Sequence, residues 1–163
     1  MGQMEISFGM IFSIILIIAV LGIAFYVIRY FSSLTDCASV GLFYTSLGKN
    51  VDQSWAATTS RSLFEGNVPS SVTYVCFGNL TQQPLNANDD NLIKNIEDHY
   101  KFSTHDNVFL YPPGTGSCTP DLGTTFIQHV KVDNFFCSQV SSGKVSITIL
   151  KNSFDALSTI QPA

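Results

Sequence analysis

An uninterrupted apolar stretch near the N-terminus limits what this chain can fold into. It occupies residues 5–31, and no charged side chain occurs from Ile6 to Ile28. At about 1.5 Å per residue, a helix over this run is roughly 35 Å long, enough to cross a hydrocarbon core of about 30 Å. The run is too long for the apolar part of a cleaved secretory signal, and no small-residue cleavage site follows it. We therefore expect a membrane-spanning helix that stays on the mature protein.

The carboxylate of Glu5 stands at the leading edge of this helix. It can lie among lipid headgroups at the helix N-terminus, where a negative charge is mildly favoured. Alternatively, it pairs with a free α-amine, its own or a neighbour's, when helices pack together, because an unpaired buried charge is costly. The residues alone leave both interpretations open.

Gly2-Gln3, the early Glu5 and the helix rich in Ile, Leu and Phe resemble the N-terminus of type IV pilins and archaellins, most closely the archaeal type with a class III signal. The resemblance implies that Gly2 precedes a cleavage point and that Gln3 is the first mature residue. It implies that 6–28 anchors the free subunit in the membrane and forms the core of the assembled filament. It also implies that Glu5 neutralises the N-terminal amine of a neighbour and so sets the register between subunits.

Two features depart from that pattern. No Lys or Arg precedes Gly2, and Ser7 follows Glu5 although the archaeal pattern places the serine first. If Met1 were the first residue of a processed chain, Glu5 would fall at the family's fifth mature position. Met1 and Gln3 therefore both stay open as the mature N-terminus.

Composition limits the possible partners of the remaining part of the chain. The chain has 163 residues, so about 130 lie beyond the apolar run, a usual size for one domain. Only 12% of the residues are charged, and the net charge is −4. A polar but sparsely charged surface suits a protein that packs against its own copies or carries glycans. The acidic balance argues against nucleic acid as a partner, because no basic patch could bind phosphates.

Four cysteines lie beyond the apolar run, at Cys37, Cys76, Cys118 and Cys137. None forms a C-x-x-C motif, and an even number in an extracellular domain favours two disulfides. Cys76 and Cys137 both lie in strand-like runs, so we expect them to pair. Cys37–Cys118 follows by elimination, and free buried thiols in a reducing compartment are the alternative.

Two further features bear on which side of the membrane the domain lies. Asn79-Leu80-Thr81 is an N-glycosylation sequon in a polar stretch, which fits an outward-facing domain. Arg29 is the only basic side chain near either end of the apolar run, and it weakly opposes an external domain. The cysteines and the resemblance outweigh Arg29, and we expect the domain at the cell surface.

The chain beyond the apolar run predicts an α+β fold. An amphipathic helical stripe comes first, at Val40, Phe43, Tyr44, Leu47, Val51 and Trp55. Strand-like runs follow at 62–67, 71–77, 107–111, 124–131, 135–140, 144–150 and 155–160, with a short helix at 91–100. We expect a hydrophobic helix over 1–31 that continues into an amphipathic helix packed on an antiparallel β-sheet, within a β-rich head over 32–163. This arrangement resembles the usual shape of a pilin-type subunit.

No set of residues predicts an enzyme. His99 and His105, with Asp98 and Asp106 beside them, could form a metal-ligand cluster, but their spacing matches no known motif. The sequence contains neither a nucleophile elbow nor a phosphate-binding loop. We expect no cofactor, no metal and no small-molecule substrate.

The sequence thus favours a structural function. We expect a subunit of an extracellular filament of the type IV pilus kind that polymerises with its own copies through residues 3–31 and serves surface attachment. Before assembly the subunit would be anchored in the membrane, and Gly9 and Gly22 would let neighbouring helices approach closely. The alternative is a single-pass surface protein whose external domain binds a partner or glycan without polymerising. A membrane-tethered enzyme is the third candidate.

Overall fold

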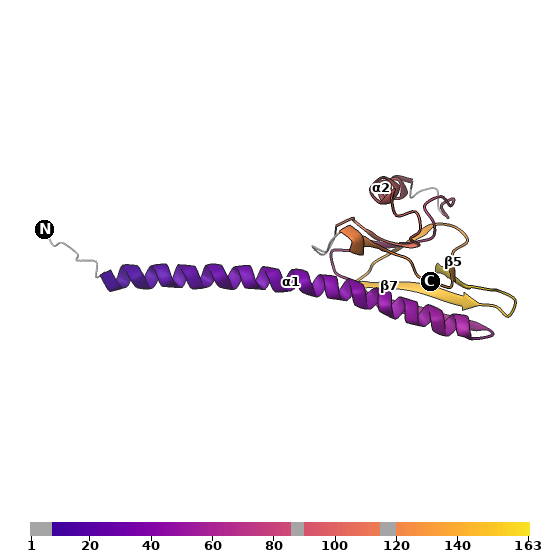
Figure 1. Cartoon of the computed structure of the whole chain (residues 1–163), viewed down its shortest axis with the longest axis horizontal. Coiled ribbons are helices and arrows are strands. Elements are labelled where there is room, and N and C mark those ends of the chain that lie inside the picture. The colour runs from indigo at the N-terminus through magenta and orange to yellow at the C-terminus, as the bar shows by residue number, and fades with distance from the viewer. Residues whose placement is uncertain (1–7, 86–89, 115–119) are drawn as a thin grey trace.

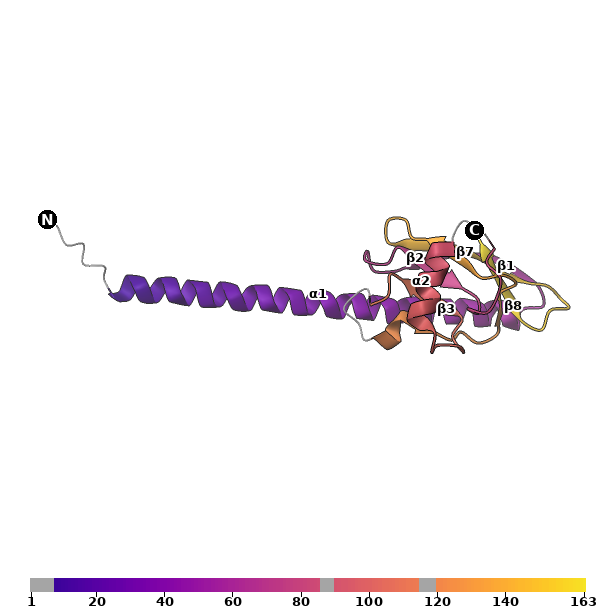
Figure 2. The same ribbon diagram turned by 90° about the horizontal axis from the view of Figure 1, so that it is seen from above.

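One helix, α1 (Phe8–Ala56), runs along most of the length of the molecule, and the head packs along its C-terminal half (Figure 1). The computed structural model describes residues 8–85, 90–114 and 120–163. The N-terminal half of α1 projects away from the strands, and its C-terminal half lies along them (Figures 1 and 2). The predicted long helix is therefore confirmed, and it has 49 residues.

The helix has no break where the projecting half meets the head. The hydroxyl of Thr35 donates to the carbonyl of Phe31, 3.0 Å away and one turn earlier. The hydroxyl of Ser39 donates to the carbonyl of Thr35 in the same way, at 2.9 Å. These bonds satisfy the hydroxyls within the helix, so the two halves form one continuous rod.

The strands form two sheets rather than the one that the sequence predicted. The first has the order β1-β7-β8-β5, and the second has the order β4-β3-β2-β6. All strand pairs are antiparallel except β5 with β8. The bounds are β1 Ser60–Asn67, β2 Tyr74–Phe77, β3 Val108–Tyr111, β4 Thr124–Thr125, β5 Val130–Lys131, β6 Phe136–Gln139, β7 Lys144–Lys151 and β8 Ser158–Pro162. Two shorter helical elements complete the head, α2 (Asp90–Tyr100) and η3 (Pro120–Gly123).

The head has two cores, one on each side of the second sheet. In the larger core, the α1 residues Val40, Phe43, Leu47 and Val51 pack against alternate side chains of both sheets. In the smaller core, α2 covers the opposite face of the second sheet. Figure 1 accordingly shows α1 and α2 on opposite sides of the strands. The predicted amphipathic stripe is thus buried at four positions, whereas Tyr44 is half-buried and Trp55 is 41% exposed.

The predicted strand over 124–131 is wrong as a single element. β4 pairs in the second sheet and β5 in the first, so the chain crosses between the sheets within this run. Asn107 holds the crossing, because its side-chain amide donates to the carbonyl of Ile127 and its side-chain oxygen accepts from the Ile127 amide, both at 2.8 Å. His129 then adopts a positive φ of 61°, which ends the extended conformation.

The last strand begins three residues later than predicted, at Ser158 rather than at Asp155. Residues before it form a turn, in which the side-chain amide of Asn152 donates to the carboxylate of Asp155 at 2.8 Å. The ammonium of Lys151 also donates to the backbone carbonyl of Asp155. These side-chain bonds compete with strand pairing and delay the start of β8.

Candidate assembly surface

The projecting half of α1 is not covered by the described residues of the head. Every residue from Gly9 to Ser32 is exposed, and no part of the most apolar 18-residue window is buried. The uncharged part within the helix, Phe8 to Ile28, is about 31 Å long at 1.5 Å per residue. It is long and apolar enough to cross a membrane. A surface of this kind requires an apolar environment.

Apolar side chains surround the whole circumference of this half. Large hydrophobic side chains stand at nearly every position from Met10 to Phe31, and each is at least 41% exposed. The C-terminal half differs, because there Val40 and Leu47 are buried while Lys49 and Asp52 are exposed. A helix with one apolar face can be covered by one neighbour, but a helix that is apolar all round must be surrounded. Lipid or several packed helices would do this.

The hydroxyl of Ser13 in the projecting half is satisfied within the helix. The hydroxyl of Ser13 donates to the carbonyl of Gly9 at 2.8 Å, so this side chain presents no unpaired donor to an apolar environment. At Gly22 an added Cβ would meet no atom within 4 Å. The fold of the single subunit therefore does not require a glycine at position 22.

The uncharged part of α1 ends at Arg29. This side chain is exposed, and it forms no ion pair with any residue in the described ranges. Tyr26 and Tyr30 lie one turn or less away and are also exposed. Aromatic and basic residues of this kind favour the boundary between an apolar phase and water. The apolar and polar parts of the molecule therefore meet between Arg29 and Val40.

The residues predicted for processing and register, Gly2, Gln3 and Glu5, lie outside the described residues. Their roles stay predictions. Of the assembly residues, the structure places Gly9 and Gly22 on the exposed half of α1, 13 positions apart in the sequence.

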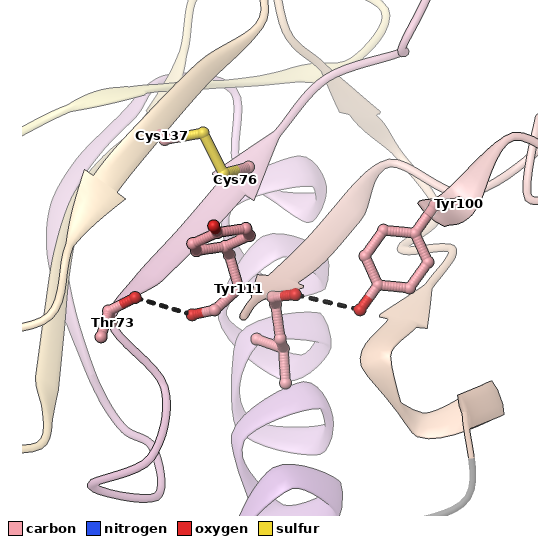
Figure 3. Close-up of a disulfide and its surroundings, with 6 residues drawn as sticks. Thr73, Cys76, Tyr100, Tyr111 and Cys137 are labelled. Atoms are coloured by element: carbon pink, nitrogen blue, oxygen red, sulfur yellow. Dashed lines mark hydrogen bonds between the residues drawn. A yellow bond between two sulfur atoms is a disulfide. The ribbon is translucent and has the colours of Figure 1, made fainter. Parts of the chain in front are cut away.

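The predicted disulfide between Cys76 and Cys137 is confirmed, and it joins β2 to β6 inside the second sheet (Figure 3). Cys76 is fully buried in the smaller core beneath α2. Cys37 is also disulfide-bonded. Cys118, which the sequence assigns to it by elimination, lies outside the described residues. The alternative of free buried thiols is wrong for the three described cysteines.

Asn79 lies in an exposed turn directly after β2. Its side-chain oxygen accepts hydrogen bonds from the backbone amide and the hydroxyl of Thr81, both at 3.0 Å. Its backbone amide donates to the side-chain oxygen of Gln82 at 2.8 Å. The sequon is therefore held on the surface of the head by its own hydrogen bonds.

The candidate metal ligands do not form a cluster. Within the described ranges, no group of three or more His, Cys, Asp or Glu side chains could hold a metal ion. His99 and His105 are exposed, and the ring of His99 stands edge-on to Tyr100 at 4.9 Å between centroids.

Two features of the head escaped the sequence analysis. The first is a contact at the C-terminal end of α1, where the rings of Trp55 and His129 stack at 3.8 Å between centroids and Asp52 accepts from the His129 Nδ1 at 3.0 Å. The second is a hollow of about 500 Å³ between the end of α2 and β4. Both unite residues more than 20 positions apart, and a pairing of that kind gives no signal in a local sequence pattern.

No protein-family model matches this chain, and no curated protein or solved structure is detectably similar to it.

Proposed function

We propose that this chain is a structural subunit of an extracellular filament of the type IV pilus kind. In this proposal the projecting half of α1 anchors the free subunit in the membrane and then packs against the same segment of other copies. The head lies on the filament exterior, where it serves surface attachment. The observation that carries the proposal is the projecting half of α1, which is apolar on all sides and uncovered from Gly9 to Ser32.

Three properties of α1 support packing against several copies. The apolar surface extends around the circumference, so a single partner helix would leave most of it exposed. A Cβ added at Gly22 would meet no atom within 4 Å outside the adjacent helix backbone, and small residues allow the close approach of helix backbones. The Ser13 hydroxyl bonds within its own helix, so transfer from lipid to a helix bundle requires no exchange of hydrogen bonds.

The second candidate is a single-pass surface protein that does not polymerise. The length of the uncharged segment, about 31 Å, favours it, because this segment matches one bilayer crossing. Exposed Tyr26, Arg29 and Tyr30 also suit one membrane boundary. Both candidates share the membrane anchor and differ in whether sister copies contact one another.

Electron microscopy of the protein separates the two candidates. Full-length protein is expressed in its membrane, and preparations from the cell surface and after detergent removal are imaged for helical filaments. Glu5→Ala should stay in the membrane fraction but yield few or no filaments, because the register carboxylate is lost. Glu65→Ala is the matched control, since Glu65 is an exposed carboxylate on β1 of the head.

Each outcome has a clear meaning. Filaments from the wild type and from Glu65→Ala, but not from Glu5→Ala, support the whole proposal. Normal filaments from Glu5→Ala would remove the role of Glu5 while leaving the assembly. The complete absence of filaments, with the protein monomeric in the bilayer, would favour the single-pass candidate. Mass spectrometry of the N-terminus adds a test of processing, since a chain that begins at Gln3 supports cleavage after Gly2.

A further inference from the structure

An open hollow on the head combines aromatic and hydrogen-bonding side chains. It has a volume of about 500 Å³ and lies between the last turn of α2, the connection that follows it, and β4. Its lining includes Phe102, Phe126, Asp106, Thr124 and His99. This volume lies within the range of about 300–1,000 Å³ that is usual for small-molecule sites.

The two phenylalanines at this hollow are exposed to solvent. Phe102 is 87% exposed and Phe126 is 56% exposed, whereas Phe77 and Phe109 are buried in the two cores of the head. Exposed aromatic rings beside polar groups suit a ligand that has an apolar face and a polar edge. The rings therefore favour a ligand over a purely structural role for these positions.

Asp106 supplies an unpaired acceptor at the same place. The side chain is half-buried, and within the described ranges its carboxylate has no hydrogen-bond or ion-pair partner. Half-buried carboxylates normally find a partner, because partial loss of water leaves them undersolvated. Asp106 and Phe126 also line a second hollow of about 250 Å³, so the two hollows share a wall along which an extended ligand can continue.

The charges around the hollow select a neutral ligand. The Asp106 carboxylate repels anions. The ammonium of Lys101 stands 5.1 Å from the centroid of the Phe102 ring, so the ring face already has a cation beside it and a second cation would be repelled. Lys131 in the second hollow pairs with Asp133 at 2.7 Å, and this hydrogen bond raises the pKa of Lys131. Among the described residues, the second hollow therefore has no unpaired lysine to bind an anion.

We propose that this hollow binds a neutral saccharide, with a sugar ring stacked on Phe126 or Phe102 and its hydroxyls donating to Asp106. Pyranose rings present apolar C–H faces to aromatic rings and hydroxyl groups to carboxylates, which is the combination that this hollow supplies. The site belongs to the head alone. It goes beyond the proposed assembly and holds whether or not α1 polymerises.

A glycan microarray tests the proposal directly. Full-length protein, kept in an amine-oxide detergent because glycoside detergents carry sugars, is applied to neutral, sialylated, sulfated and free-amine oligosaccharides. We expect binding to neutral glycans and none that is specific to charged ones. Titration with the best neutral glycan should show that Phe126→Ala and Asp106→Ala each weaken binding about tenfold or more, the expected effect of losing one stacking or charge-assisted contact.

Two matched variants serve as controls. Phe154→Ala removes a fully exposed phenylalanine, and Asp98→Ala removes an exposed carboxylate on α2, and neither residue lines the hollow. Both should bind within about twofold of the wild type, since surface substitutions away from a contact have small effects. Thermal unfolding verifies that each variant is folded, and Phe102→Ala replaces Phe126→Ala if the latter is not. Absence of binding to neutral glycans, preference for charged ones, or equal binding by the hollow variants and the wild type would overturn the proposal.

Discussion

Tyr100 shows how one buried hydroxyl ties α2 to the second sheet. The ring is 5% exposed in the smaller core, and its hydroxyl donates to the carbonyl of Leu110 at 3.0 Å (Figure 3). Burial disfavours the charged phenolate and raises the pKa of Tyr100 to about 12. The native state therefore holds this proton at a pH at which the unfolded chain has already released it.

This raised pKa predicts a decline of stability at alkaline pH. An unfolded tyrosine ionises near pH 10, so the contribution of Tyr100 is fully present below pH 10 and is lost as the pH rises to about 12. In Tyr100→Phe the free energy of unfolding should decrease less between pH 10 and 12 than it does in the wild type. At pH 7 this variant should be less stable by about 1 kcal/mol, because the Leu110 carbonyl loses its partner. Denaturant unfolding across pH 7–12 measures both effects, and identical slopes for the two proteins would contradict the prediction.

Gly66 and Gly41 provide a pair of glycines with opposite expected effects. An added Cβ at Gly66 would lie 2.5 Å from the Phe43 ring and 2.8 Å from the Phe64 ring, whereas at Gly41 it would meet nothing within 4 Å. We expect Gly66→Ala to cost about 1–3 kcal/mol, because both aromatic rings must move in a packed core. Gly41→Ala should stabilise α1 by up to about 1 kcal/mol through helix propensity. Thermal unfolding measures both, and a lowered midpoint for Gly41→Ala would show an unrecognised contact at that site.

At the scale of elements, one residue connects the end of α1 to two strands. The ring of His129 stacks on Trp55 of α1, and its backbone carbonyl accepts from the amide of Ser158 at the start of β8. His129 also directly precedes β5. The indole N–H of Trp55 donates to the carbonyl of Ala156 at 2.9 Å. Trp55 therefore joins the last turn of α1 to the segments that lead into β5 and β8 of the first sheet.

Removal of the Trp55 ring should loosen this end of α1. We expect Trp55→Ala to lower the free energy of unfolding by about 2 kcal/mol, since it loses both the stack and the hydrogen bond. Trp55→Phe keeps a ring and should lose about half as much. Leu42→Ala is the control on the same helix, because Leu42 is 70% exposed, and its effect should be under about 0.5 kcal/mol. Equal effects of Trp55→Ala and Leu42→Ala in denaturant titrations would refute this role of Trp55.

Helices were easier to predict from the sequence than the sheets. The apolar run and the stripe at Val40, Phe43, Leu47 and Val51 have local periods, and the structure confirms both. The division into two sheets depends on Asn107, whose side chain bonds to Ile127 and turns the chain from one sheet to the other. A hydrogen bond between residues 20 positions apart does not alter the local periodicity of the sequence. The same limit explains why the predicted strand over 124–131 was wrong.

The sequence draws attention to single residues of the saccharide hollow but does not show that they lie together. The sequence offers His99, Asp98, His105 and Asp106 as possible metal ligands. In the structure His99 lines the first hollow, His105 lines the second and Asp106 lines both. Phe126 lies in the β-like run 124–131, so the sequence predicts it in a strand. The polar residues around Phe126 in the sequence are a weak signal that its side chain is exposed. Its position in a hollow depends on the distant α2 segment, and the local sequence does not show that contact.

At the scale of the molecule, the described core of the head packs on the C-terminal half of α1 and not on the projecting half. No residue from Gly9 to Ser32 is buried, and the buried part of α1 begins at Val40. A fragment of residues 32–163 should therefore be monomeric and soluble without detergent, and its head should unfold within about 1 kcal/mol of the full chain. Light scattering after size-exclusion chromatography, together with denaturant unfolding, measures both properties. An aggregated or unfolded fragment would show that the head requires the N-terminal segment.

The uninterrupted path of α1 through Phe31 to Val40 has a geometric consequence. Each residue of an α-helix advances the chain by about 1.5 Å and turns it by about 100°. One residue added within this path would swing the head by about 100° around the helix axis while moving it outward by little more than an atom's width. The number of residues between the apolar half and the head therefore determines the rotation of the head around the helix axis. It thereby determines the direction in which the saccharide hollow faces.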